Sequence, residues 1–239
     1  MKNYRKYLKY FGLFILLSAV IAFYFGNDLM IYLENNSNSQ SIGTPASGEL
    51  INGKRLPNSG DNFIAYSRLG TLLGRNAVHH KLRDLIKASY DKIYDKYPQY
   101  VYVYGETGWI TGGDFYPHKT HQNGLSVDFM TPVINSSGEP EFLPTTIFNK
   151  FGYDIDFNEN GEYDDLQIDF ESMAVHINSL YQLSKLYGLK ISRIIFYPEL
   201  QHYLWNTELG RDLRSKIKFS DKKSWVIHDD HYHIDFELL

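Results

Sequence analysis

Residues 118–129 read HKTHQNGLSVDF, and the second half of this stretch alternates between apolar and polar side chains. In a β-strand, such alternation puts the apolar side chains on one face and Asp128 on the other, so it predicts a half-buried strand. The first half carries His118 and His121 and ends in an Asn-Gly pair, which is typical of turns. A straight strand would place His121 and Asp128 on opposite faces, so a turn is needed to fold His121 back toward Asp128.

A second strand-like segment, HYHIDFEL at residues 231–238, alternates in the same way. His231 and His233 fall together on the face opposite its apolar side chains. The imidazoles of His121 and His233 and the carboxylate of Asp128 would form a set of three ligands that suits Zn²⁺. Three protein ligands leave a position for water, which is the arrangement of catalytic zinc sites. Because the chain has no cysteine, a zinc site here has to use histidines and carboxylates.

The remaining patterns predict an α+β fold. Apolar residues recur with a helical period over residues 76–97, with Asn76 as the expected N-cap, and over residues 168–188. Strands are expected at residues 100–106 and 191–198, the second of them buried. Helices and strands follow one another without a regular βαβ rhythm. We therefore expect a single globular domain with a mostly antiparallel sheet flanked by helices.

The N-terminus reads as an export segment. A basic stretch, MKNYRKYLKY, precedes residues 11–25, which carry no charge. This order predicts a signal peptide or signal anchor at residues 1–27, and we expect the uncleaved anchor. The preceding basic residues place the rest of the chain outside the cytoplasm. Residues 28–40 are expected to form a polar linker and residues 41–239 the folded domain.

Composition and the other clusters narrow the possible functions. The net charge of −4 argues against nucleic acid as a partner, because nucleic-acid binding needs a basic face. His79 and His80 are expected at the surface, and His176 in or next to the core. Residues 156–167, DFNENGEYDDLQ, match half of a calcium loop, but Gln167 stands where an EF-hand needs a bidentate glutamate. An ordinary turn explains this stretch equally well.

The two histidine motifs, in this order, resemble those of the penicillin-insensitive murein endopeptidases. These are zinc peptidases of the group that includes lysostaphin-type enzymes, D-Ala-D-Ala metallopeptidases and the hedgehog signalling domain. The resemblance covers most of residues 41–239. Four stretches carry it. YGETGWITGGDFYPHKTHQNGLSVDF is similar to the family's approach to H-x-x-H-Q-x-G-x-x-V-D, and WVIHDDHYHIDF is similar to the closing H-x-x-H-x-H motif. The other two stretches are SIGTPASGELINGKRLP and ISRIIFYPEL.

The resemblance implies a role for each residue that matches these motifs. It implies that the zinc ligands are His121, Asp128 and His233. His231 would be the catalytic histidine. The two remaining motif residues are His228, which would support His231, and His118, a further site residue near or on the metal.

A peptidase mechanism can be written with these side chains. The chain has no H-E-x-x-H glutamate, so we expect His231 to accept a proton from the attacking water and to pass it to the leaving amine. His228 or His118, when protonated, would stabilise the developing oxyanion. Asp229 and Asp230 are either partners that fix imidazole tautomers or a solvated acidic turn.

As a family member, the chain would hydrolyse D-alanyl–meso-diaminopimelyl cross-links in peptidoglycan. It would act in the periplasm, tethered to the inner membrane by residues 11–25. Two alternatives remain open. One is a carboxypeptidase that trims terminal D-Ala from peptidoglycan stems. The other is a zinc-bound module that binds the cell wall or regulates a partner without cleaving, although intact His228 and His231 favour an enzyme.

Overall fold

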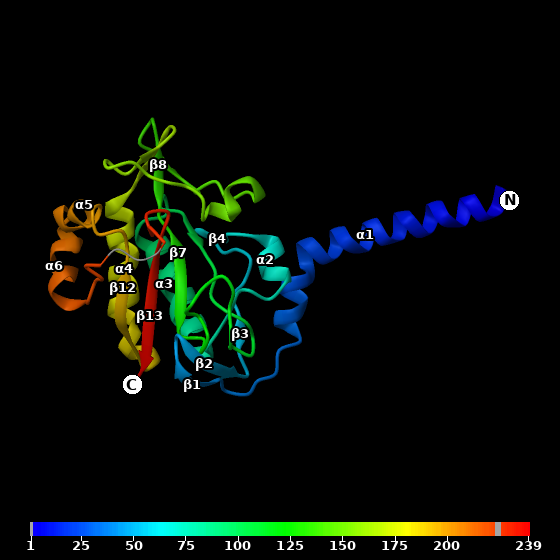
Figure 1. Cartoon of the computed structure of the whole chain (residues 1–239), viewed down its shortest axis with the longest axis horizontal. Coiled ribbons are helices and arrows are strands. Elements are labelled where there is room, and N and C mark those ends of the chain that lie inside the picture. The colour runs from blue at the N-terminus through cyan, green and yellow to red at the C-terminus, as the bar shows by residue number, and fades with distance from the viewer. Residues whose placement is uncertain (1, 223–225) are drawn as a thin grey trace.

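The computed structural model describes residues 2–222 and 226–239. Met1, the first residue of the predicted export segment, and Trp225, the first residue of the stretch WVIHDDHYHIDF, lie outside the described residues. The fold is α+β, as predicted. Its sheets are mixed but mostly antiparallel and are flanked by helices, and one long apolar helix extends from the domain at the N-terminus (Figure 1).

The central sheet has five strands and holds both histidine motifs. Its order is β12-β13-β7-β6-β4, and only β4 and β6 run parallel. The strands are β4 (Phe63–Ala65), β6 (Tyr102–Tyr104), β7 (Ser126–Met130), β12 (Leu189–Ile195) and β13 (His231–Leu238). β7 and β13 are antiparallel neighbours, which brings residues about a hundred positions apart in the sequence into direct opposition.

Two helices, α3 (His80–Lys96) and α4 (Phe170–Ser184), pack against each other and cover one face of this sheet. The apolar side chains of β7 and β13 face them. Phe129 packs edge-on against His176 of α4, and Tyr232 shares a hydrogen bond with the same ring. The predicted alternation is therefore confirmed, and it leaves Asp128 and His233 on the opposite face. The short helices α5 (Gln201–Asn206) and α6 (Glu208–Lys216) pack beside α4.

Smaller sheets and helices complete the fold. A four-stranded antiparallel sheet has the order β10-β11-β8-β9, and two short pairs, β1-β2 and β3-β5, lie nearer the N-terminus. The bounds are β1 (Gln40–Thr44), β2 (Ser47–Ile51), β3 (Lys54–Arg55), β5 (Ala77–Val78), β8 (Val133–Asn135), β9 (Pro140–Glu141), β10 (Glu162–Tyr163) and β11 (Leu166–Ile168). The remaining helices are α2 (Arg68–Leu72) and the 3₁₀ segments η1 (Ile147–Gly152) and η2 (Lys185–Tyr187).

Helix α1 (Lys2–Tyr32) is long and apolar enough over Lys6–Tyr32 to be a membrane anchor or a signal sequence. It continues past residue 27, where the linker was expected to begin. Asn27 is buried against the domain, and Glu34 forms an ion pair with Arg83 of α3. The stretch predicted as a linker thus includes the last turn of α1 and contacts the domain.

Three local predictions were wrong, each for a physical reason. The first helix begins at His80 rather than near Asn76, because residues 77–78 pair with β3, a partner more than twenty positions earlier. His79 is buried and caps this helix, accepting a hydrogen bond from the Lys81 backbone, so it is not a surface residue. Strand β12 forms the edge of the sheet and is only partly buried.

Candidate metal centre

The site is built on a cross-strand pair. His233 on β13 lies directly opposite Asp128 on β7, on the sheet face away from α3 and α4. His233 Nδ1 is 2.8 Å from Asp128 Oδ1, and its Nε2 is 2.9 Å from Asp235 Oδ1. Asp235 in turn accepts hydrogen bonds from Ser126 Oγ at 2.6 Å and from Arg193 Nε at 2.6 Å. The His233 ring is therefore held between two carboxylates.

His121 joins this pair through the predicted turn. Gly124 has φ +74°, and a Cβ there would meet the backbone nitrogen of His79 at 3.1 Å, so the turn requires glycine. The turn brings His121 Nε2 to 3.2 Å from Asp128 Oδ1. His121 Nδ1 lies 3.2 Å from the carbonyl of Thr107, to which it donates as the protonated nitrogen. This hydrogen bond leaves the Nε2 lone pair directed at the site.

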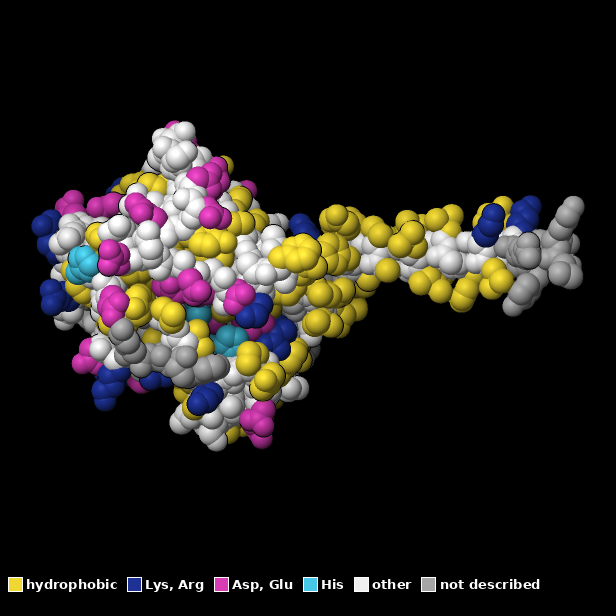
Figure 2. All heavy atoms as spheres, turned by 45° about the horizontal axis from the view of Figure 1, so that its top comes forward, with side chains coloured by type: hydrophobic (Ala, Val, Ile, Leu, Met, Phe, Trp, Pro, Cys, Tyr) yellow, Lys and Arg dark blue, Asp and Glu magenta, His cyan; other side chains and the backbone are white. Residues whose placement is uncertain are grey.

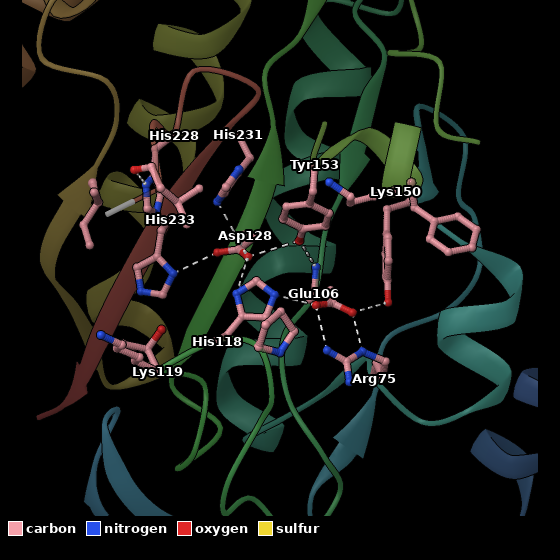
Figure 3. A pocket seen from close by; sticks show the side chains of 16 residues that line it. Arg75, Glu106, His118, Lys119, Asp128, Lys150, Tyr153, His228, His231 and His233 are labelled. Carbon is pink, nitrogen blue, oxygen red and sulfur yellow. Dashed lines mark hydrogen bonds and ion pairs between the residues drawn. The ribbon is translucent and has the colours of Figure 1, made fainter. Parts of the chain in front are cut away.

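His228, just before β13, and His231, its first residue, also line the site (Figure 3). His231 Nε2 is 3.8 Å from Asp128 Oδ2, and its Nδ1 contacts the carboxylate of Asp230. His228 lies beside it, with ring centroids 4.6 Å apart, and donates from Nδ1 to the carbonyl of Val226 at 2.8 Å. The expectation for Asp230 as a partner that orients a histidine matches this contact.

Asp229, in contrast, accepts a hydrogen bond from the Phe157 backbone at 2.8 Å. Its carboxylate also accepts from the Asp230 backbone at 3.1 Å, so it holds backbone groups rather than a histidine of the site. Of the two acidic residues, only Asp230 has the orienting contact that the sequence suggested.

His118 enters from the loop before β7. Its Nδ1 is 3.9 Å from Asp128 Oδ2, and its Nε2 is 2.6 Å from Glu106 Oε2. Glu106 also forms a bidentate pair with Arg75, which Figure 3 shows below the site. Tyr153 connects the Asp128 carboxylate to the Glu106 backbone, because its hydroxyl donates to Asp128 Oδ2 at 3.1 Å and accepts from the Glu106 N–H at 2.7 Å.

A shared pattern emerges from these contacts. Each of four histidines turns one ring nitrogen toward Asp128 and the other toward a different oxygen acceptor. The four are His118, His121, His231 and His233, and their second acceptors are Glu106, the Thr107 carbonyl, Asp230 and Asp235. Metal-binding histidines are held in this way, with the second nitrogen donating to a carboxylate or a carbonyl.

The side chains of His118, His121 and Asp128 can hold a metal ion, since their ligand-type atoms lie within 4.8 Å of one another. His121 supplies a test of this fit. Its Nε2 is fully buried and, within the described residues, has no hydrogen-bond partner, because the nearby Asp128 oxygen is poorly aligned for one. A buried nitrogen without a partner is costly unless something else satisfies it, and a metal ion would do so.

The charges of the site also suit a cation. Although burial opposes ionisation, His121 and His231 keep the pKa of Asp128 well below its usual range. Burial lowers the pKa of His121 and keeps that ring neutral. Burial acts in the same direction on His233, but Asp235 and Asp128 raise its pKa to about 9. Since metal ligands must be deprotonated, metal binding would release a proton from His233.

A pocket of about 370 Å³ opens next to these residues. Asp128, His228, His231 and His233 line it with polar groups, and Tyr66, Phe151 and Tyr153 line it with aromatic rings. Lys119 and Lys150 also line it. Such a pocket, which combines apolar surface with convergent polar groups, is typical of a ligand site.

Five of the six predicted site residues line this pocket, and the sixth, His121, lies behind Asp128 at 3.2 Å. The predicted ligand set is His121, Asp128 and His233. The group whose ligand atoms lie within 4.8 Å of one another has His118 in place of His233. Sequence reasoning missed Glu106, Tyr153, Arg75 and Tyr66. Glu106 is the last residue of the strand predicted at 100–106, which was its only local signal, and Tyr153 comes from a loop without any motif.

The possible calcium loop folds as a turn. Asn158 Oδ1 accepts hydrogen bonds from the backbones of Asn160 and Glu162, at 2.9 and 3.0 Å. Among the residues that the structure describes, the acidic side chains of 156–167 do not form a metal-holding group. The contacts match the alternative of an ordinary turn.

No family model matches the chain, and a search of curated proteins found no match.

Proposed function

We propose that this chain is a zinc-dependent peptidase that hydrolyses peptide cross-links in peptidoglycan, between D-alanine and meso-diaminopimelate. One observation carries the metallopeptidase part: four imidazoles converge on the buried carboxylate of Asp128 beside a pocket, each with its second nitrogen held. The substrate follows from the resemblance of the two histidine motifs to murein endopeptidases.

The residues that would hold zinc are His121, Asp128 and His233. Zinc supplies Lewis acidity, which polarises the scissile carbonyl and acidifies an attacking water. Tyr153 keeps Asp128 oriented with a hydrogen bond to Oδ2. Burial and the neighbouring carboxylates raise the pKa of this tyrosine far above its usual range, so it remains a neutral donor.

His231 is the proposed proton carrier. Its Nδ1 contact with Asp230 turns Nε2 toward the pocket, where it can accept a proton from water and return it to the leaving amine. Burial opposes a charge on this ring, but Asp230 and Asp128 raise its pKa, which increases its basicity. The proton therefore has a defined acceptor within the chain.

His228 is a weaker candidate for stabilising the oxyanion than the motif suggests. Burial and the nearby His231 lower its pKa to about 3, so the ring is neutral near pH 7. Its proton then lies on Nδ1, which donates to Val226, and Nε2 is left as an acceptor. We infer that His228 supports His231. His118 Nε2 is held by Glu106 in the same way, so His118 can donate to an oxyanion only from a protonated Nδ1.

Lys119 and Lys150 line the same pocket as the histidines. Their positive charges complement a substrate with free carboxylates, as peptidoglycan stems have. We further propose that α1 anchors the enzyme in the inner membrane with its domain in the periplasm, because basic residues precede the apolar run.

The test is mass spectrometry of purified cross-linked muropeptide dimers incubated with the full chain in detergent, with and without a chelator. We expect dimers to become monomers only when the metal is present. Loss of a terminal D-Ala alone would make the chain a carboxypeptidase. An absence of both products with zinc bound would support the non-cleaving module.

The matched variants are His231→Ala and His202→Ala, of which the second removes an exposed histidine on α5. His231→Ala should lower turnover by about 10²–10⁴-fold, the usual contribution of a general base, while zinc stays near one ion per chain. His202→Ala should leave turnover unchanged. Wild-type turnover in His231→Ala would show that the proton acceptor is another residue.

A further inference from the structure

Helix α1 enters the domain without a flexible connection. The apolar run ends at Phe25, and Asn27 is already buried, at 1% exposure. The Asn27 side chain donates to the Leu56 carbonyl at 3.0 Å and accepts from Asn76 Nδ2 at 3.0 Å. It also accepts from Arg55 at 3.3 Å. A helix held by buried hydrogen bonds within two residues of its apolar run cannot swing freely relative to the domain.

Contacts on both sides of Asn27 reinforce this attachment. Gly26 packs so closely on α2 that a Cβ would lie 2.5 Å from Leu72 Cδ1. Arg68 of α2 lies over the ring of Tyr24, 5.5 Å from its centroid. Beyond the helix, Glu34 accepts from the Arg55 backbone at 2.7 Å. The end of α1 and the domain therefore form one packed unit.

The length of α1 fixes where the membrane surface would lie. The candidate span Lys6–Tyr32 has 27 residues, whereas about 20 residues cross a hydrocarbon core of roughly 30 Å. A span that begins near Lys6 thus leaves the bilayer close to Phe25, next to Gly26 and α2. The part of the domain around α2 then has to lie at the bilayer surface.

This part of the domain exposes large apolar side chains. On α2 and directly after it, Leu69 and Leu73 are 42% and 62% exposed. On η1, Ile147 and Phe148 are 67% and 91% exposed. The two segments are neighbours, since Phe151 of η1 packs edge-on against Tyr66 just before α2, with centroids 6.2 Å apart. We call these four side chains the apolar patch.

The patch lies on the side from which α1 leaves the domain. Figure 1 shows α2 at the root of α1 and the green η1 turns on the same side. Figure 2 shows hydrophobic side chains that continue from the helix onto the adjacent domain surface. Arg68 lies beside the patch on α2, and long basic side chains of this kind reach toward lipid headgroups from an apolar surface.

We propose that the apolar patch, Leu69, Leu73, Ile147 and Phe148, inserts into the interfacial layer of the bilayer that α1 crosses, so that the domain rests on the membrane in one fixed orientation. The occupant is the lipid surface, because the patch is continuous with the only long apolar helix in the described residues. Tyr66, Lys150 and Phe151 line the metal pocket and border the patch, so the pocket is held beside the bilayer.

Because the chain has no cysteine, single-cysteine variants can carry one polarity-sensitive fluorophore at a chosen position. The full chain would be reconstituted into phosphatidylethanolamine–phosphatidylglycerol vesicles with and without lipids that bear a quencher near the headgroup. Leu73→Cys and Phe148→Cys report on the patch, and Phe14→Cys reports on α1. The control is Leu186→Cys, a 79% exposed leucine next to β12, the sheet edge opposite β4 and α2.

We expect several-fold stronger lipid quenching and a blue-shifted emission at positions 73 and 148 than at position 186. Quenching at position 14 with equal, weak quenching at 73, 148 and 186 would overturn the proposal, because the domain would then stand away from the lipid. In unlabelled Leu73→Cys treated with a mild oxidant, disulfide formation between two copies would show that a second chain covers the patch instead. Absence of quenching at position 14 would remove α1 from the bilayer and the proposal with it. No arm of this experiment depends on peptidase activity.

Discussion

Two fully buried histidines, His121 and His176, lie on opposite faces of the same strand pair and differ in what surrounds them. In each ring, Nδ1 has a partner and Nε2 has none within the described residues. Burial lowers the pKa of both. His121 Nε2, however, faces Asp128 at 3.2 Å, whereas His176 is stacked on Tyr90, with centroids 4.9 Å apart, and touches Phe129. Burial and a free nitrogen are thus common to a core histidine and a candidate ligand, and the facing carboxylate separates them.

The largest effect on metal binding is expected when the Asp128 carboxylate is removed. Asp128→Ala should empty the metal site, because the four imidazoles then face one another without a negative charge. We expect zinc to fall from about one ion per chain, the expectation for a three-ligand site, to near zero. His176→Phe should keep full zinc occupancy. Elemental analysis of both purified variants, with circular dichroism to verify folding, is the measurement, and full occupancy in Asp128→Ala would exclude Asp128 as a ligand.

A second test separates the two possible third ligands. His233 Nδ1 lies 2.8 Å from Asp128, and its ring is almost fully buried, whereas the nearest His118 nitrogen is 3.9 Å away and its side chain is 20% exposed. We therefore expect His233→Ala to lose the metal and His118→Ala to retain it while losing turnover. Zinc titration of each variant gives the answer. The reverse outcome would assign the metal to His118, His121 and Asp128.

The alternation of β7 and β13 explains why the ligand face could be predicted. A period of two assigns every side chain of a strand to one face, so Asp128, His233 and Asp235 were certain to lie together if the two strands paired. The turn before β7 needs glycine at a positive φ, and this requirement was also visible in the sequence.

Other parts of the site depend on contacts between distant segments. Tyr153 and Glu106 meet at Asp128 through loops that no local period describes. His79 changed from an expected surface residue to a buried helix cap because β5 pairs with β3 and moves the start of α3. Such pairings carry no signal within a short window, so the sequence alone could not predict them.

A smaller effect is expected one contact away from the metal. Asp235→Asn weakens the acceptor that fixes His233 Nε2, and such orienting partners typically account for about 10–100-fold in metal affinity. Glu237→Gln is the matched control, since it makes the same chemical change two residues further along β13, where Glu237 pairs with Lys190 at the surface. Competition with a fluorescent zinc chelator measures both affinities. Equal affinities in the two variants would mean that Asp235 does not orient the ring.

The smallest expected effect concerns His176 alone. Burial lowers its pKa to about 3, and its reference value in an unfolded chain is about 6.5. Below pH 6.5 the unfolded chain binds a proton that the folded chain excludes. As the pH is lowered from 6.5, folding stability therefore decreases by about 1.4 kcal/mol per pH unit until the folded pKa is reached. His176→Phe removes this loss, although it leaves the Tyr232 hydroxyl without its partner at every pH. The variant should therefore be the less stable protein at pH 7, and its deficit should shrink by about 2 kcal/mol at pH 5. Urea unfolding of both chelated proteins in detergent measures the difference, and a deficit that does not change with pH would show that His176 can take up a proton without unfolding.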